Sequence, residues 1–249
     1  MKTVDKAMTV LAQFSIEHTE MGLSELARRA DLDKAATRRL LVALIKHGYI
    51  EQSASTKGYR LGHGFLSLAR IREATVPLKR AAQETTDRLT AELDETTHIS
   101  VPLPEHMSTI AYTLPSRGNI INIIPAQPLP FHATASGIAY LANCSDTQRG
   151  LSLSVKRNRI TAHTPTSKAD TLKAVEAAKA QGFAQCRSTF ESGVASIAMA
   201  FFAGDAEPTG SLAIALPESR LTDAHRDHLL VSLRDSVQRI ERALTGASA

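Results

Sequence analysis

The sequence has no tryptophan, and only two cysteines, Cys144 and Cys186. Aromatic residues make up 4% of the chain, which argues against a surface that stacks single-stranded bases on aromatic rings. Two cysteines exclude a disulfide-stabilised scaffold and fit a reducing compartment. No apolar run approaches the roughly 20 residues that a membrane span needs. Residues 1–9 lack the apolar core of a secretory signal. We therefore expect a cytoplasmic protein that stays outside the membrane.

The basic residues are unevenly distributed along the 249 residues. The net charge is only +4, but residues 1–75 contain 12 Lys and Arg against 8 Asp and Glu, and the rest contains 17 of each. Phosphate contacts need a locally basic surface rather than a basic protein. The distribution favours a nucleic-acid-binding segment in the first third, although ordinary surface charge would also account for so small a surplus.

The first third of the chain has the pattern of three short helices. Apolar residues recur at helical spacing over residues 4–14. Ser24 is the expected N-cap of a second helix, and Asp33 is the expected N-cap of a third helix at 34–47. Gly48 should end that helix as the glycine after its C-cap. The short polar turn between the second and third helices predicts a helix-turn-helix.

A β-hairpin should follow directly. Residues 49–50 begin an extended segment, 53–58 form a polar turn, and 59–61 return as a second strand. A hairpin placed after a helix-turn-helix is a wing, so a winged helix-turn-helix is expected.

The third helix should have two faces with different roles. At 100° per residue, its apolar and basic faces diverge by about 130°. A solvated amphipathic helix would show the same pattern, but the preceding helix, the turn and the hairpin favour DNA recognition in the major groove. Arg38 and Arg39 could bind guanine or phosphate, and Lys34 phosphate. The expected DNA-binding residues are Ser24, Lys34, Ala35, Ala36, Thr37, Arg38 and Arg39, with Lys57 and Arg60 in the wing.

The remaining residues mix strand and helix patterns. A connecting helix over 65–72 is followed by Pro77, which permits a new helix start, and by a helix at 78–93. This mixture indicates an α/β or α+β domain. The expected strands are 98–103, 108–114, 120–124, 196–202 and 211–216, and the expected helices are 133–141, 167–181 and 222–244.

Four blocks of the sequence resemble the isocitrate lyase regulator (IclR) family of bacterial transcription factors. They are LSELARRADLDKAATRRLLVALIKHGYIEQ with GYRLG, then PLPFHATASGIAYLA, GVASIAMAFF and GSLAIALPESRLT. The resemblance implies an α+β fold with a winged helix-turn-helix at 1–62, a linker helix at 63–76, and an effector-binding domain at 77–249 whose curved antiparallel sheet is flanked by helices. It also implies a homodimer, or a dimer of dimers, on a palindromic double-stranded operator.

Family members often respond to small acids, some of them aromatic, and the resemblance places the pocket near His132 and residues 193–196. Arg187 is the candidate counter-ion for a carboxylate, because its guanidinium can bind both oxygens; the alternative is an exposed loop arginine. His132 and Ser196 could equally bond to backbone, and the apolar candidates could be plain core. The expected effector-binding residues are Ile121, Ile123, Gln127, Phe131, His132, Cys186, Arg187 and Ser196.

This chain departs from the family pattern at several positions. Ala35 and Ala36 stand where the family tends to have Ser-Thr, which shifts the expected DNA contacts to the neighbouring basic residues. Cys186 begins a segment that is often acidic in the family, and Ser196 stands where cysteine is common. Ala213 and Ala215 replace strand serines. The pocket should therefore be less acidic than usual and should suit an organic anion.

Enzymatic and metal chemistry have weak support. Residues 133–137 lack the leading glycine of a nucleophile elbow, and a Cys186–His132 pair would have no third group. His225 and His228, three positions apart on the last expected helix, could both contact a metal, but no cysteine or clustered carboxylates accompany them. No glycine-rich phosphate loop is present, so no cofactor or metal is expected. The prediction is a repressor controlled by a small organic acid; the alternative is a ligand-binding module whose winged helix docks a protein.

Overall fold

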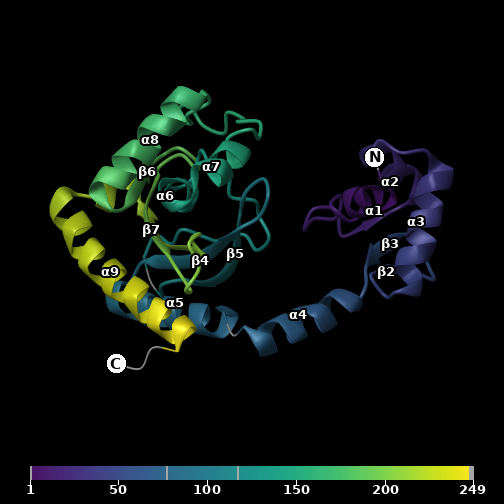
Figure 1. The fold of residues 1–249 in the computed structure, drawn as a ribbon, viewed down its shortest axis with the longest axis horizontal. Helices are drawn as coiled ribbons and strands as arrows, with labels where there is room; N and C mark the ends of the chain where they lie inside the picture. Colours follow the sequence, from purple (N-terminus) through teal and green to yellow (C-terminus); the bar gives the residue numbers. More distant parts are fainter. Residues whose placement is uncertain (1, 77, 117, 247–249) are drawn as a thin grey trace. The chain divides into compact units, whose positions relative to one another are not determined.

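The computed structural model describes residues 2–76, 78–116 and 118–246, and the chain divides into two units, Met1–Val76 and Pro77–Ala249 (Figure 1). The helix start expected at Pro77 lies outside the described residues. The first unit carries a short antiparallel sheet in the order β1-β3-β2. Its elements are α1 (Thr3–Leu11), β1 (Glu20–Met21), α2 (Leu23–Arg29), α3 (Lys34–Lys46), β2 (Ile50–Gln52), β3 (Tyr59–Leu61) and α4 (Gly64–Thr75).

Local chemistry fixes both ends of α3. The Asp33 carboxylate accepts the Ala36 N–H at 2.7 Å, which confirms the expected N-cap. Gly48 has φ +74°, and its N–H donates to the Ile45 carbonyl while the Tyr49 N–H donates to the Leu44 carbonyl. This pair of bonds is the Schellman ending that glycine permits. Between these ends, α3 packs on the core of the unit, which includes Val10, Leu26, Leu41 and Ile50.

Two expectations for the first unit need correction, and one strand was not predicted. Gly22, not Ser24, is the N-cap of α2, so Ser24 is an exposed residue within the first turn. The first helix ends at Leu11 rather than at residue 14, because Phe14 leaves the helix and packs against the core. The strand β1 pairs with β3 although its two residues carry no strand pattern.

The second unit is built on one antiparallel sheet in the order β5-β4-β8-β7-β6. This confirms the predicted fold class. No helix within the described ranges is both long and apolar enough to cross a membrane. The elements are α5 (Leu78–Leu93), β4 (Thr96–Pro102), β5 (Met107–Thr113), α6 (Ala135–Asn143), α7 (Asp146–Ser152), α8 (Lys168–Gln181), β6 (Ala184–Arg187), β7 (Val194–Phe201), β8 (Gly210–Pro217), the 3-10 turn η1 (Glu218–Arg220) and α9 (Asp223–Thr245).

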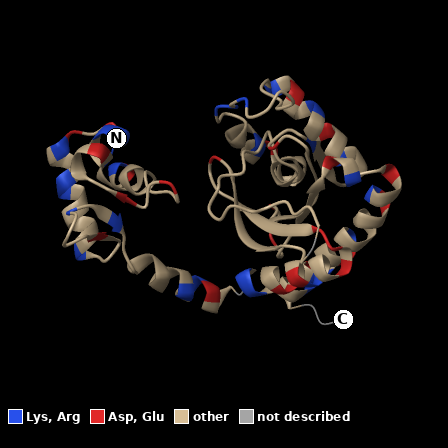
Figure 2. Cartoon of the chain, turned by 180° about the vertical axis from the view of Figure 1, so that it is seen from behind, with Lys and Arg blue, Asp and Glu red and all other residues tan. Residues whose placement is uncertain are grey.

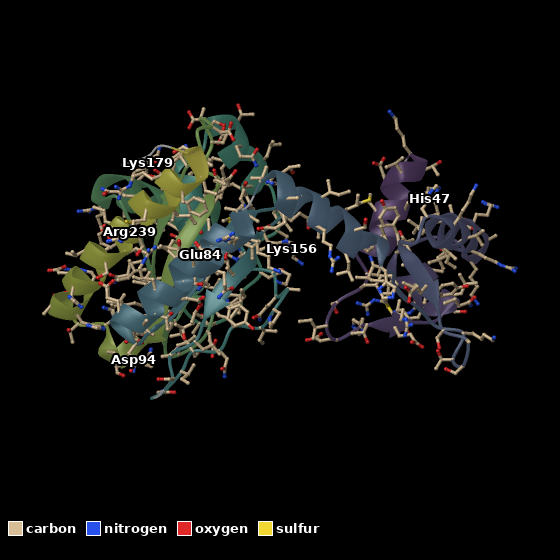
Figure 3. All side chains as sticks on the ribbon, turned by 90° about the horizontal axis from the view of Figure 1, so that it is seen from below. His47, Glu84, Asp94, Lys156, Lys179 and Arg239 are labelled. Carbon is tan, nitrogen blue, oxygen red and sulfur yellow. The ribbon has the colours of Figure 1, made fainter. Side chains whose placement is uncertain are left out.

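Strand alternation gives the sheet two different faces. Ile197 on β7 and Ile214 on β8 lie in the core shared with α5 and α9. Ala198 and Ala213, one residue along each strand, lie in the core shared with α6 and α8. Figure 3 shows α5 and α9 side by side, with exposed Glu84 and Arg239 on their solvent side. Small residues on the α6 face of the sheet leave room beside that helix.

Two parts of the second unit differ from the sequence prediction. Residues 120–124 form no strand; they follow an irregular path and are tethered by the Thr96 hydroxyl, which donates to the Ile121 carbonyl at 2.8 Å. The strand β6 and the helix α7 were not predicted. The helix ends set by Ser167, which caps α8, and by Gly182, at φ +78°, are as predicted.

Candidate DNA-binding surface and ligand cavity

The exposed face of α3 is basic. Lys34, Ala35, Arg38 and Arg39 are all exposed, and Figure 2 shows Lys and Arg along this helix. Within the described residues, none of the three cations forms an ion pair. Their charges are therefore available to phosphate or to guanine.

Two residues predicted to contact DNA face the core instead. Ala36 is 8% exposed and Thr37 is fully buried. The Thr37 hydroxyl donates to the Asp33 carbonyl at 2.9 Å, so its polar group is satisfied inside the unit. Because α3 turns 100° per residue, positions 36 and 37 point away from the face that Arg38 and Arg39 share with Lys34.

The wing presents one free and one paired cation. Lys57 is exposed at the hairpin turn and has φ +62°, a left-handed conformation stabilised by its N–H donating to the Ser53 carbonyl at 3.0 Å. Arg60 on β3 donates through Nε and Nη2 to the Glu51 carboxylate at 3.3 and 3.2 Å. Arg60 must therefore exchange or share this partner before it contacts DNA, which weakens its expected role.

A cavity of about 690 Å³ opens beside the N-terminus of α6 in the second unit. Strand residues of the α6 face form its floor, among them His98, Ser196 and Ala215. The irregular residues 119–124 form one wall, and the β6–β7 hairpin loop at 189–193 forms another. None of the described lining residues is Lys or Arg, and the acidic one, Glu191, is exposed to solvent.

The polar end of the cavity is the first turn of α6. Thr134, Ala135 and Ser136 line the cavity there. The Thr134 side chain caps the helix by accepting the Gly137 N–H at 3.1 Å. The N–H groups of Ala135 and Ser136 have no acceptor among the described residues. A helix N-terminus with free N–H groups carries partial positive charge and favours an anion.

His98 on β4 lies next to this helix start. Its Nε2 is 3.2 Å from the Ser136 hydroxyl oxygen, while its Nδ1 is buried without a hydrogen-bond partner in the described chain. Burial lowers the pKa of His98 to about 4, so the imidazole is neutral near pH 7. A neutral imidazole has one donor and one acceptor nitrogen, so His98 adds a polar but uncharged ring to the cavity lining.

Five of the predicted effector-binding residues line the cavity: Ile121, Ile123, Gln127, Cys186 and Ser196. Cys186 on β6 and Ser196 on β7 are cross-strand partners. Burial raises the pKa of the Cys186 thiol to about 11, so it remains protonated at neutral pH. Cys186 therefore contributes a small apolar surface rather than a nucleophile.

Three predicted residues do not line the cavity. Arg187 points to the other side of β6, where Nη2 donates to the Leu221 carbonyl at 2.7 Å, so its expected role as a counter-ion is not supported by its position. The Nε2 of His132 is 3.1 Å from the Asn158 carbonyl, the structural alternative for this histidine. Phe131 packs in the core against Tyr140, with ring centroids 5.7 Å apart.

Sequence reasoning missed His98, Thr134 and Ser136 as cavity residues. For His98 a signal was present, since a histidine in a β-branched run is a polar group on a strand face that is otherwise buried. Thr134 and Ser136 lay in the segment examined for a nucleophile elbow, and their position at a helix N-terminus was the signal overlooked.

A winged helix-turn-helix with an unpaired basic recognition face, followed by a ligand-cavity domain, defines a ligand-responsive transcription regulator. The "IclR helix-turn-helix domain" model matches residues 3–54, and the "Bacterial transcriptional regulator IclR C-terminal" model matches residues 74–242. The chain belongs to the IclR family, as the sequence predicted. It is a DNA-binding regulator and not an enzyme.

Known proteins resemble the chain along its whole length. The transcriptional regulator XynR of Escherichia coli is 24% identical over 99% of this chain and 96% of its own. A crystal structure of an IclR regulator from Silicibacter sp. TM1040 has a TM-score of 0.93 and 32% identity, covering 100% and 98% of the two chains. An IclR homologue from Microbacterium hydrocarbonoxydans, crystallised with 4-hydroxybenzoate, has a TM-score of 0.77 at 20% identity, covering 99% and 100%, and so shares the fold.

Proposed function

We propose that this protein is a cytoplasmic repressor that binds a palindromic operator as a homodimer, paired into a dimer of dimers, and responds to a small organic acid. The observation that supports the effector class is the start of α6 in the cavity lining beside the neutral His98, where the N–H groups of Ala135 and Ser136 have no acceptor in the described chain. Repression is the regulatory sense to be tested with a reporter gene.

The DNA contacts in this proposal come from the exposed face of α3. Arg38 and Arg39 bind base edges or phosphate in the major groove, Lys34 binds phosphate, and Lys57 reaches the backbone from the wing. Ser24 and Ala35 are also exposed. Two copies related by a two-fold axis would place two such faces on two half-sites, which accounts for a palindrome.

Exposed apolar side chains around α4 support self-association. Leu66, Leu68 and Ile71 are 62%, 50% and 59% exposed, and α4 contributes no buried residue within the described chain. Exposed aliphatic side chains on one helix are costly in water unless a partner covers them. We assign that partner to a second copy of the chain, and sedimentation equilibrium of the full-length protein measures the assembly.

The cavity suits an acid with an apolar body. The carboxylate would accept the Ala135 and Ser136 N–H groups, and the isoleucines of the irregular wall would cover a ring or short chain. The Microbacterium hydrocarbonoxydans neighbour binds 4-hydroxybenzoate, so this acid is the first compound to test. Cys186 and Ser196 would lie along the body of the ligand, with Gln127 at the exposed rim.

Isothermal titration calorimetry with benzoate, 4-hydroxybenzoate and short aliphatic acids tests the effector class. The methyl ester of each acid is the matched control, because it keeps the body and removes the charge. We expect one or more acids to bind and their esters to bind at least about tenfold more weakly, since hydrogen bonds to a charged group contribute more than neutral ones. Equal binding of acid and ester would contradict an anion at the helix start.

A further inference from the structure

The short turn η1 lies between β8 and α9 and touches both irregular walls of the cavity. It follows Pro217, which lines the cavity, and precedes the N-cap of α9. Its first and last residues, Glu218 and Arg220, carry opposite charges and bind different walls. Glu218 bonds to the hairpin loop after β6, and Arg220 bonds to the start of the irregular segment 119–124.

Glu218 closes the hairpin loop that forms one wall. Its carboxylate accepts a hydrogen bond from the Ser188 hydroxyl, and that hydroxyl accepts the Gly193 N–H at 2.9 Å. The Glu218 N–H donates to the Gly193 carbonyl at 2.8 Å. Glu218, which lies outside the hairpin, is thus bonded to both ends of the loop at 189–193, at one end directly and at the other through Ser188.

Arg220 secures the opposite wall. Its Nη2 donates to the Glu95 carboxylate and, at 3.4 Å, to the Asn119 carbonyl. The Glu95 side chain is only 5% exposed, and His225 Nε2 lies 3.6 Å from its other oxygen. Because a buried carboxylate needs a partner, Arg220 is strongly held, and through it Asn119 is held at the edge of the cavity.

Neither wall has a sheet ladder to order it. Residues 119–124 adopt no regular structure. In the described chain, their backbone is bonded at the Asn119 carbonyl by Arg220, at the Ile121 carbonyl by Thr96, and at the Ile124 carbonyl by the Gln127 N–H. An irregular segment with few backbone hydrogen bonds opens at low free-energy cost. The hairpin loop is also held at Thr189, whose carbonyl accepts the Thr164 hydroxyl and whose hydroxyl donates to the Ala133 carbonyl, both at 2.7 Å. The bonds from η1 therefore add to the closed arrangement of both walls, and they are a larger share of the bonds to residues 119–124.

We propose that Glu218 and Arg220 are positioning residues that hold the two cavity walls in the geometry that binds the effector, without touching the effector themselves. This inference rests on the proposed function, because it takes the cavity as the effector site. A site populated in its competent form for only a tenth of the time binds about tenfold more weakly, so loss of either residue should raise the apparent Kd by that order.

Backbone ¹⁵N relaxation of the full-length protein without ligand tests the positioning directly. In Arg220→Met, we expect the order parameters of residues 119–124 to fall from about 0.85 to below about 0.6 while those of residues 189–193 are unchanged. In Glu218→Ala, the opposite pattern is expected. Arg220→Lys keeps a cation for Glu95 and should restore most of the order. Arg226→Met is the matched control, since Arg226 pairs only with Asp223 and Asp227 of its own helix in the described chain.

Calorimetry with 4-hydroxybenzoate and the other acids supplies the second readout. About tenfold weaker binding in Arg220→Met and Glu218→Ala, with wild-type binding in Arg226→Met, is the supporting result. If no acid binds wild-type protein, the proposed effector class fails, and the order parameters still decide the positioning. Uniform or unchanged order parameters in both variants overturn the inference. If Arg220→Met does not fold, Glu218→Ala and Arg220→Lys decide it alone.

Discussion

Arg39→Ala is the sharpest test of how the regulator binds DNA. Arg39 is exposed on α3, and no residue of the described chain forms an ion pair with it. Its neighbours Leu40 and Leu41 supply the packing of this turn and are not changed. Alanine is also the best helix former, so the variant should keep its fold and its melting temperature. Any loss of DNA binding then reports the missing guanidinium.

The magnitude follows from counterion release. One phosphate contact contributes about 0.9 to the slope of log K against log salt concentration, so the two copies of the proposed dimer would contribute about 1.8. Between 50 and 200 mM salt, a slope change of that size alters the affinity ratio of wild type to variant by about 12-fold. If Arg39 instead binds guanine, each copy should lose about 1–3 kcal/mol on the specific site only, with little change in slope.

Fluorescence anisotropy with DNA from upstream of the protein's own gene, measured at several salt concentrations, separates these outcomes. Arg234→Ala removes the same charge from an exposed position on α9 and is the control. A folded Arg39→Ala protein with wild-type affinity and wild-type salt slope would refute the assignment of α3 as the recognition helix.

Three further predictions address the helix caps and the cavity. Asp33→Ala removes the acceptor of the Ala36 N–H and should lower the unfolding free energy of the first unit by about 1 kcal/mol in urea denaturation. Ala135→Pro removes one cavity N–H at a position where proline fits; by calorimetry it should weaken acid binding about tenfold or more, whereas its effect on the methyl ester should be smaller. Burial lowers the pKa of His98 from 6.5 to about 4, so the unfolded chain binds more protons than the folded chain between these two pH values. The contribution of His98 to the free energy of unfolding should be full above pH 6.5 and fall by roughly 3 kcal/mol toward pH 4. His98→Gln should flatten this pH dependence in thermal melts.

Features decided by neighbouring residues could be predicted from the sequence. The capping of α3 by Asp33, its ending at Gly48, and the limits of α8 at Ser167 and Gly182 depend on side chains and backbone conformations within a few positions. The basic face of α3 followed from helical periodicity in the same way. The prediction that Ser24 caps α2 was wrong because Gly22, two residues earlier, has the extended conformation of an N-cap and begins the helix there.

Features decided by distant partners could not be predicted. Residues 120–124 have the β-branched composition of a strand, yet they do not pair with the sheet. The outer edge of β5, opposite β4, forms only an isolated bridge between Met107 and Leu129 in the described chain. The direction of Arg187 depends on the alternation of β6, and its acceptor at Leu221 lies 34 positions away. A cavity is space left by packing, and the small residues that leave it, such as Ala215, have the same composition as ordinary core.

The lack of a cation among the described lining residues has a consequence for sensing. A buried arginine would bind a carboxylate through two charged hydrogen bonds and would need that partner when the cavity is empty. Backbone N–H groups at a helix start carry only partial charge and contribute about 0.3–2 kcal/mol, so the empty state would cost less and the proposed acid would leave more readily. A ligand shifts a regulator only by its difference in affinity between two states. Because the N–H groups of Ala135 and Ser136 are fixed by α6, we expect the difference to arise in the walls at 119–124 and 189–193.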